Sequence, residues 1–159
     1  MAGLTAGQIA KTIAASLIAA VLPSSARASL GGSVTTIDAD RVHVEGALMR
    51  IVRTDAYALH EIRSASGTMI REYANGSGTV FAVAWNGPFM PDLRQVLGGH
   101  FDRYQTAMQA RARTRTARGV VVIDEPGLVV RMSGHPRAFT GRAFVPALMP
   151  AGFQPESIR

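Results

Sequence analysis

The sequence predicts an α+β fold, an antiparallel β-sheet of about six strands packed with one principal amphipathic helix. Two observations carry this prediction: strand-like runs separated by short turns, and an apolar stripe of helical period between two groups of such runs. The first group is an N-terminal meander, because turns rich in Gly, Ser and Asn join antiparallel neighbours. Its three strands are expected at residues 57–63, 68–74 and 79–85.

The third of these runs is apolar on both sides. Strict alternation along a strand places Phe81, Val83 and Trp85 on one face and Val80, Ala82 and Ala84 on the other. Such a strand has to be central or covered twice. One helix covers one face, so the other needs a partner, a second subunit or the C-terminal tail.

The principal helix is expected after the meander, with Pro91 in its first turn. Gly98 and Gly99 lie inside it and cost about 1 kcal/mol each relative to Ala, which predicts a close approach to the sheet or a kink. The helix is marked by the apolar stripe Leu93, Val96, Leu97, Phe101, Tyr104 and Met108. A further helix is expected from Val34 to Ile51, where apolar residues recur at roughly helical spacing.

A second group of strands follows the principal helix. The expected runs are 119–123, 128–133 and 137–145, with a turn at residues 124–127. Three prolines, Pro146, Pro150 and Pro155, then predict an extended, non-helical tail over residues 146–159.

Residues 1–28 are predicted to be a signal peptide of the general secretory type. Lys11 precedes an apolar run over residues 12–22, and Ala26 and Ala28 supply the small-x-small pattern of a cleavage site. A single transmembrane helix is the rival interpretation, but the run has about half of the roughly 20 residues that a bilayer span needs. We therefore expect cleavage after Ala28, a single α+β domain over 29–159 with no transmembrane segment, and a periplasmic or secreted location.

Composition excludes several kinds of chemistry. The chain has no cysteine, so disulfides, thiolate nucleophiles, Cys-ligated zinc and a lipid-modified N-terminal cysteine are ruled out. Its formal charge of +6 falls to +4 when Lys11 and Arg27 leave with the leader. Lys11 is the only lysine, so the mature chain cannot form a Schiff base.

A basic run after the principal helix is a candidate contact patch for an anionic partner. Arg111, Arg113, Arg115 and Arg118 have no acidic residue among them. The structural interpretation is a solvated helix end, where cations offset the helix dipole. The functional one is contact with anionic lipid, glycan or an acidic protein surface. Nucleic acid is not expected, because the protein is exported and no aromatic side chains interleave the run.

The residues that could carry catalysis do not form a convincing set. Glu61 and Glu72 lie on neighbouring meander strands, but Arg63 and Arg71 on the same strands favour cross-strand ion pairs over a pair of catalytic carboxylates. Ser77 lies in a hairpin turn instead of a nucleophile elbow. His43, His60, His100 and His135 lack metal-ligand spacing, and no glycine loop is placed to bind phosphate, so neither a metal nor a cofactor is expected.

Several segments together resemble one known family. They are Leu30–Gly32, Met69–Tyr73, Gly78–Trp85 with Gly87–Pro88, Pro91–Gly98 and Gly141–Gly152. This pattern is similar to a family of small exported proteins from Gram-negative bacteria, the domain-of-unknown-function family DUF 2844. The resemblance implies a short exported protein and assigns no activity or catalytic residues.

The sequence thus favours an exported cell-envelope protein that acts as a non-enzymatic interaction module, binding an envelope protein or another copy of itself. Two alternatives stay open. One is a hydrolase of an envelope polymer. The other is a binder of anionic lipid or glycan through the run from Arg111 to Arg118.

Overall fold

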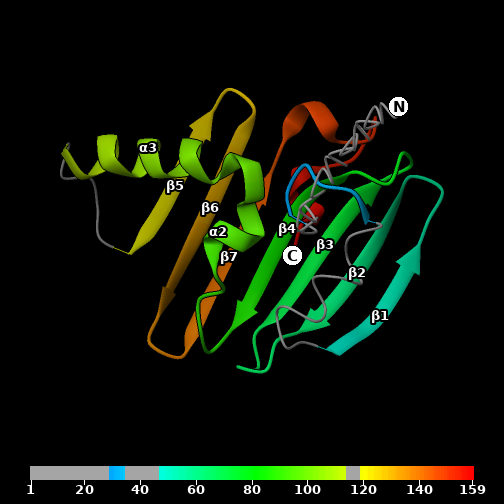
Figure 1. Ribbon diagram of the computed structural model, residues 1–159, viewed down its shortest axis with the longest axis horizontal. Helices are drawn as coiled ribbons and strands as arrows, with labels where there is room; N and C mark the ends of the chain where they lie inside the picture. Colours follow the sequence, from blue (N-terminus) through cyan, green and yellow to red (C-terminus); the bar gives the residue numbers. More distant parts are fainter. Residues whose placement is uncertain (1–28, 35–46, 114–118) are drawn as a thin grey trace, which may run out of the picture.

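The computed structural model describes residues 29–34, 47–113 and 119–159. They form a seven-stranded antiparallel sheet of order β1-β2-β3-β4-β7-β6-β5, with one broken helix on it (Figure 1). The α+β class with one principal helix is confirmed, but the sheet has seven strands, not six. The strands are β1 Ala47–Arg53, β2 Tyr57–Arg63, β3 Met69–Asn75, β4 Val80–Gly87, β5 Val120–Glu125, β6 Leu128–His135 and β7 Ala138–Phe144.

The additional strand, β1, replaces the end of the helix predicted for Val34–Ile51, so that prediction is wrong over the residues from Ala47 onward. β1 pairs along its length with β2, for example Ile51 opposite His60. Ile51 and Val52 are β-branched and suit a strand, and hydrogen bonding to a ready-made edge outweighs a weak helical pattern. Residues 35–46 of the predicted helix lie outside the described residues.

The principal helix is divided into α2 Leu93–Leu97, a 3₁₀ turn η2 Gly98–His100, and α3 Phe101–Arg113. Asp92 is the N-cap, and its carboxylate accepts from the N–H groups of Arg94 (2.9 Å) and Gln95 (3.4 Å). Pro91 therefore precedes the cap and does not lie in the first turn. Gly98, at a φ of +50°, makes the predicted kink. The close approach there is to Ser29 of the N-terminal segment, not to the sheet.

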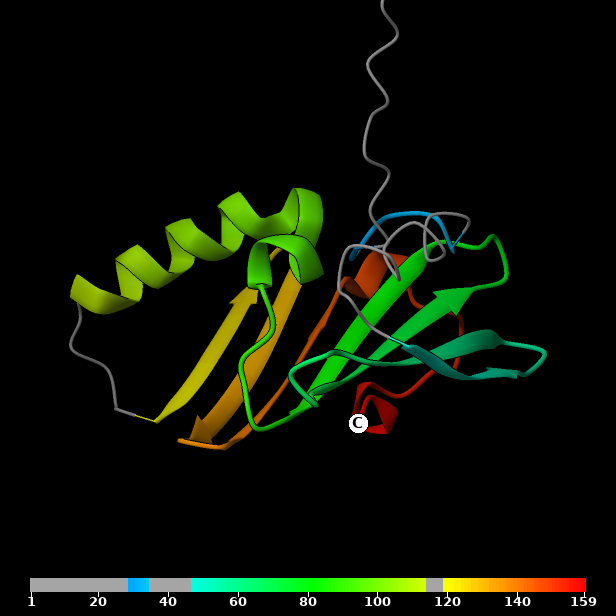
Figure 2. The same ribbon diagram turned by 60° about the horizontal axis from the view of Figure 1, so that its bottom comes forward.

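β4 is buried on both faces, and two different segments cover it. The helix side is covered by α2, α3 and the segment beginning at Ser29, whose Leu30 N–H donates to the Val96 carbonyl (3.1 Å). The other side, here called the tail side, is covered by residues 146–159 (Figure 2). This tail contains the 3₁₀ turns η3 Pro146–Leu148 and η4 Pro155–Ser157. A further turn lies between them, where the Phe153 N–H donates to the Pro150 carbonyl (3.1 Å), so the tail is not extended over its whole length, in contrast to the prediction.

Aromatic packing fixes the tail on the sheet. The ring of Phe153 lies 4.9 Å from that of Phe81 and 5.2 Å from that of Tyr57, both edge-on. Of the three covers that the sequence left open for the second face, the chain supplies the tail.

A β-bulge reverses part of the predicted facing of β4. Tyr73 lies opposite Ala82, whereas Ala74 lies opposite Val80, so Phe81 is the extra residue of the bulge. Phe81 consequently joins the tail side with Ala82 and Ala84, and Val80 joins the helix side with Val83 and Trp85. The strict alternation predicted from the sequence is therefore wrong at Val80 and Phe81.

Gly141 is required by the largest side chain of the core. It lies directly opposite Trp85 in the β4–β7 pairing, and a Cβ atom at this position would overlap the indole ring and Met132. We predict that Gly141→Ala lowers the free energy of unfolding by about 1–3 kcal/mol, measured by chemical denaturation. Gly99→Ala is the matched control, because nothing lies within 4 Å of the added atom. Equal stability of the two variants would contradict this packing.

Candidate functional site

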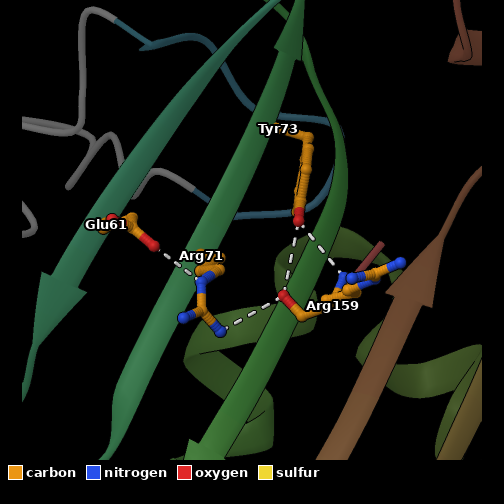
Figure 3. A network of polar contacts seen from close by, with 4 residues as sticks. All are labelled: Glu61, Arg71, Tyr73 and Arg159. Carbon is orange, nitrogen blue, oxygen red and sulfur yellow. Dashed lines mark hydrogen bonds and ion pairs between the residues drawn. The ribbon is translucent and has the colours of Figure 1, made fainter. Parts of the chain in front are cut away.

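The predicted ion pair between neighbouring meander strands is present and is tied to the end of the tail (Figure 3). Glu61 lies opposite Arg71, whose Nε donates to its carboxylate at 2.7 Å. Arg71 Nη1 also donates to the carbonyl oxygen of Arg159 (3.3 Å). The Tyr73 hydroxyl donates to the same carbonyl (3.3 Å) and accepts from the Arg159 N–H (3.2 Å). These contacts give Glu61 and Arg71 a structural role in holding the tail.

The two carboxylates considered for hydrolysis do not meet. Glu61 is on the tail side, whereas Glu72 is two residues from Ile70 on β3 and shares its helix-side orientation. The structure instead brings Glu72 directly opposite His60, and both are buried, at 5% and 7% exposure. Glu61 and Glu72 therefore cannot act together across one glycosidic bond.

The other described histidines are far from this pair in the chain and in different elements. His100 lies in η2, with its ring beside Gly31, and His135 is exposed at the end of β6. Burial, and secondarily the charge of Arg103, lowers the pKa of His100 below its ordinary value. Within residues 29–34, 47–113 and 119–159, no group of three His, Asp or Glu side chains could hold a metal ion.

The predicted basic patch is only partly placed. Arg111 reaches from α3 to the outer edge of β5, where its guanidinium donates to the carbonyls of Val120 (2.7 Å) and Val122 (3.4 Å). This contact occupies two edge acceptors that could otherwise pair with another strand. The side chain of Arg113, all of Arg115 and Arg118, and the cleavage-site residues Ala26 and Ala28 lie outside what the structure describes.

A second group of arginines, which the sequence analysis missed, lies on the tail side of β6 and β7. Arg131 and Arg142 are directly opposite each other, and Ser133 and Thr140 form the next pair on the same side. These four residues line a hollow of about 250 Å³ at the tail, together with Val120, Met132, Gly141, Ile158 and Arg159. The sequence signal was available, because a two-residue turn between His135 and Ala138 sets the register of this hairpin.

In the part of the chain that the structure describes, no helix combines the length and apolar character needed to cross a bilayer.

Comparison with known proteins places the chain in a family without assigning an activity. A family model described as "Protein of unknown function (DUF2844)" matches residues 26–158. No curated protein and no solved structure matches the chain.

His100, at the kink of the helix, gives the stability of the fold a testable pH dependence. Its pKa is lower in the folded than in the unfolded chain, so the unfolded chain binds more protons and stability falls as the pH drops below about 6.5. We predict that His100→Gln removes part of this acid sensitivity, so that the Tm of the variant gains on the wild type as the pH falls from about 7 to 5. The exposed His135 supplies the control, His135→Gln. An unchanged Tm difference between wild type and His100→Gln across this range would be the contrary result.

Proposed function

This chain belongs to the DUF2844 family, and from that premise we propose that it is an exported cell-envelope protein that works by binding an acidic envelope component and not by catalysis. Export is supported by the leader-like residues 1–28. The family match begins at residue 26, next to the predicted cleavage site, which is where a shared mature chain would start.

The observation that carries the binding role is an uncovered apolar and basic surface on the tail side of the outer strands. We call Val120, Val122 and Arg131 the β5 surface. Val120 and Val122 are 53% and 45% exposed on the edge strand, and Arg131, directly opposite Val122, is also exposed. The tail covers the same side of the sheet over β3 and β4. Exposed β-branched side chains next to a cation fit a contact with another molecule.

The charge around this surface favours an acidic partner. The adjoining hollow is lined by Arg131, Arg142 and Arg159, and none of its lining side chains is acidic. On β5, Asp124 is the acidic residue that faces the tail side. On the meander, the carboxylate of Glu61 also faces this side, but it is already paired with Arg71. The field outside β6 and β7 is therefore positive, and it attracts anionic groups.

Catalysis lacks comparable support. Glu61 is held by Arg71, and His60 and Glu72 are buried side by side on the opposite face from the hollow. The second apolar face of β4, from which the sequence predicted a partner, is covered by the tail. The β5 surface takes its place. The patch from Arg111 to Arg118 stays a separate prediction for anionic lipid or glycan.

The two claims of this proposal, export and binding, are tested on the same preparation, the chain expressed in a Gram-negative host. Export predicts that the protein is recovered from the envelope or medium and that its N-terminal residue is Ser29. Recovery of a cytosolic protein that keeps residues 1–28 would contradict the proposed export. The binding surface is tested separately, by the crosslinking experiment below.

For the binding half, we predict that a photo-crosslinking residue at position 122 captures an acidic envelope component and that one at position 51 does not. Ile51 is the matched control, because it is a β-branched residue exposed on the opposite edge strand. Val120→Ser should lower the yield at position 122 several-fold, because it removes half of the exposed apolar contact. Equal capture at positions 51 and 122, or capture of neutral components alone, would contradict the proposal.

A further inference from the structure

We propose that the hollow between β6, β7 and the tail binds an oxyanion, a phosphate or a carboxylate, carried on a group of about the size of one sugar. The proposal rests on the binding function above and deepens it by naming the ligand chemistry. It assigns the contacts with the ligand to Arg131, Arg142, Ser133 and Thr140.

The strongest indication is the direct pairing of two like charges. Arg131 and Arg142 occupy opposite positions on neighbouring antiparallel strands, where Cβ atoms are about 4.5–5.5 Å apart. Like charges in this arrangement destabilise a sheet. An oxyanion between the two guanidinium groups would convert this repulsion into two charge-assisted contacts, and guanidinium groups match the geometry of phosphate and carboxylate.

One of the two arginines is fixed in place and the other is exposed to solvent. Arg142 Nη1 donates to the tail carbonyls of Pro155 (3.1 Å) and Ile158 (3.2 Å), so its guanidinium is oriented before any ligand arrives. Arg131 is exposed and has no hydrogen bond or ion pair within the described ranges. A fixed donor lowers the entropy lost on binding, and an exposed one can close on the ligand.

Two hydroxyl groups lie next to the arginines on the same side. Ser133 and Thr140 are directly opposite each other, two residues along β6 and β7 from Arg131 and Arg142; Ser133 is half-buried and Thr140 is exposed. A hydroxyl both donates and accepts, as the hydroxyl groups of a sugar do. Val120 and Ile158 add apolar walls, and the volume of about 250 Å³ suits one small polar group better than a long polymer segment.

The charges facing the hollow leave it positive. Its lining contains Arg131, Arg142 and Arg159. Asp124 is opposite Val129 and thus diagonal to Arg131, and neither forms an ion pair with the other in the described structure. An incoming anion therefore meets uncompensated guanidinium charge.

The experiment titrates the full chain with inorganic phosphate, glucuronate and uncharged glucose at constant ionic strength, followed by the ¹⁵N–¹H NMR shifts of Ser133, Thr140 and Gly141. We expect saturable shifts with at least one of the two anions and none with glucose. Arg131→Gln should weaken binding about tenfold or more, because it removes a charge-assisted contact. Arg63→Gln is the matched control, since Arg63 is an exposed arginine at the far end of the same sheet, and it should bind as the wild type does.

The arms of the titration identify the ligand chemistry. Saturation by phosphate alone supports a phosphorylated ligand, and saturation by glucuronate alone supports an acidic sugar. The inference is overturned if neither anion saturates the shifts, or if Arg131→Gln and Arg63→Gln weaken binding equally. Thr140→Val, which keeps the size of the side chain, serves as a second variant if Arg131→Gln disturbs the spectrum outside the hollow. Crosslinking at position 122 without anion binding here would overturn this site and leave the proposed binding function intact.

Discussion

Strand β4 is apolar on both faces, and the chain has to cover it twice. From Val80 to Trp85 every residue is at most 1% exposed. The helix and the segment beginning at Ser29 cover one face, and the tail covers the other. The topology allows this because β7 lies next to β4, so the chain leaves β7 directly above the second face. Val145 continues the pairing with its N–H on the Phe81 carbonyl (2.9 Å), and the tail follows from there.

The same solution determines which surface remains for other molecules. The tail ends over β3 and β4, where Tyr73 and Arg71 hold Arg159, and it leaves the outer part of this side open. Arg142 connects the two regions, since it holds the tail at Pro155 and Ile158 and lines the adjoining hollow. The proposed binding surface is therefore a consequence of how the core is closed.

Much of the fold was predictable because its turns are local. The Asn75 carboxamide accepts from Ser77 and Thr79, and such turns marked β2 and β3 to within one residue. β1 was missed because its apolar spacing resembles a helix and only pairing with β2 decides the matter. The predicted facing of Phe81 was wrong because a β-bulge depends on the pairing of two strands. The shared side of Arg131 and Arg142 follows only once the register of the β6–β7 hairpin is known. Cross-strand neighbours joined by a short turn, such as Glu61 and Arg71, were therefore readable from the sequence, whereas the bulge and the pairing of β1 were not.

Phe153→Ala tests most directly whether the tail, and not another molecule, covers β4. We predict that the free energy of unfolding of the full chain falls by about 2 kcal/mol, less than for a fully buried phenylalanine because Phe153 is partly buried, and that it does not depend on protein concentration. The control is Phe89→Ala, at a phenylalanine that is 55% exposed, and it should change the free energy of unfolding by less than about 0.5 kcal/mol. Equal effects of the two substitutions would contradict cover by the tail, and a wild-type stability that rises with protein concentration would show that a second chain closes this face.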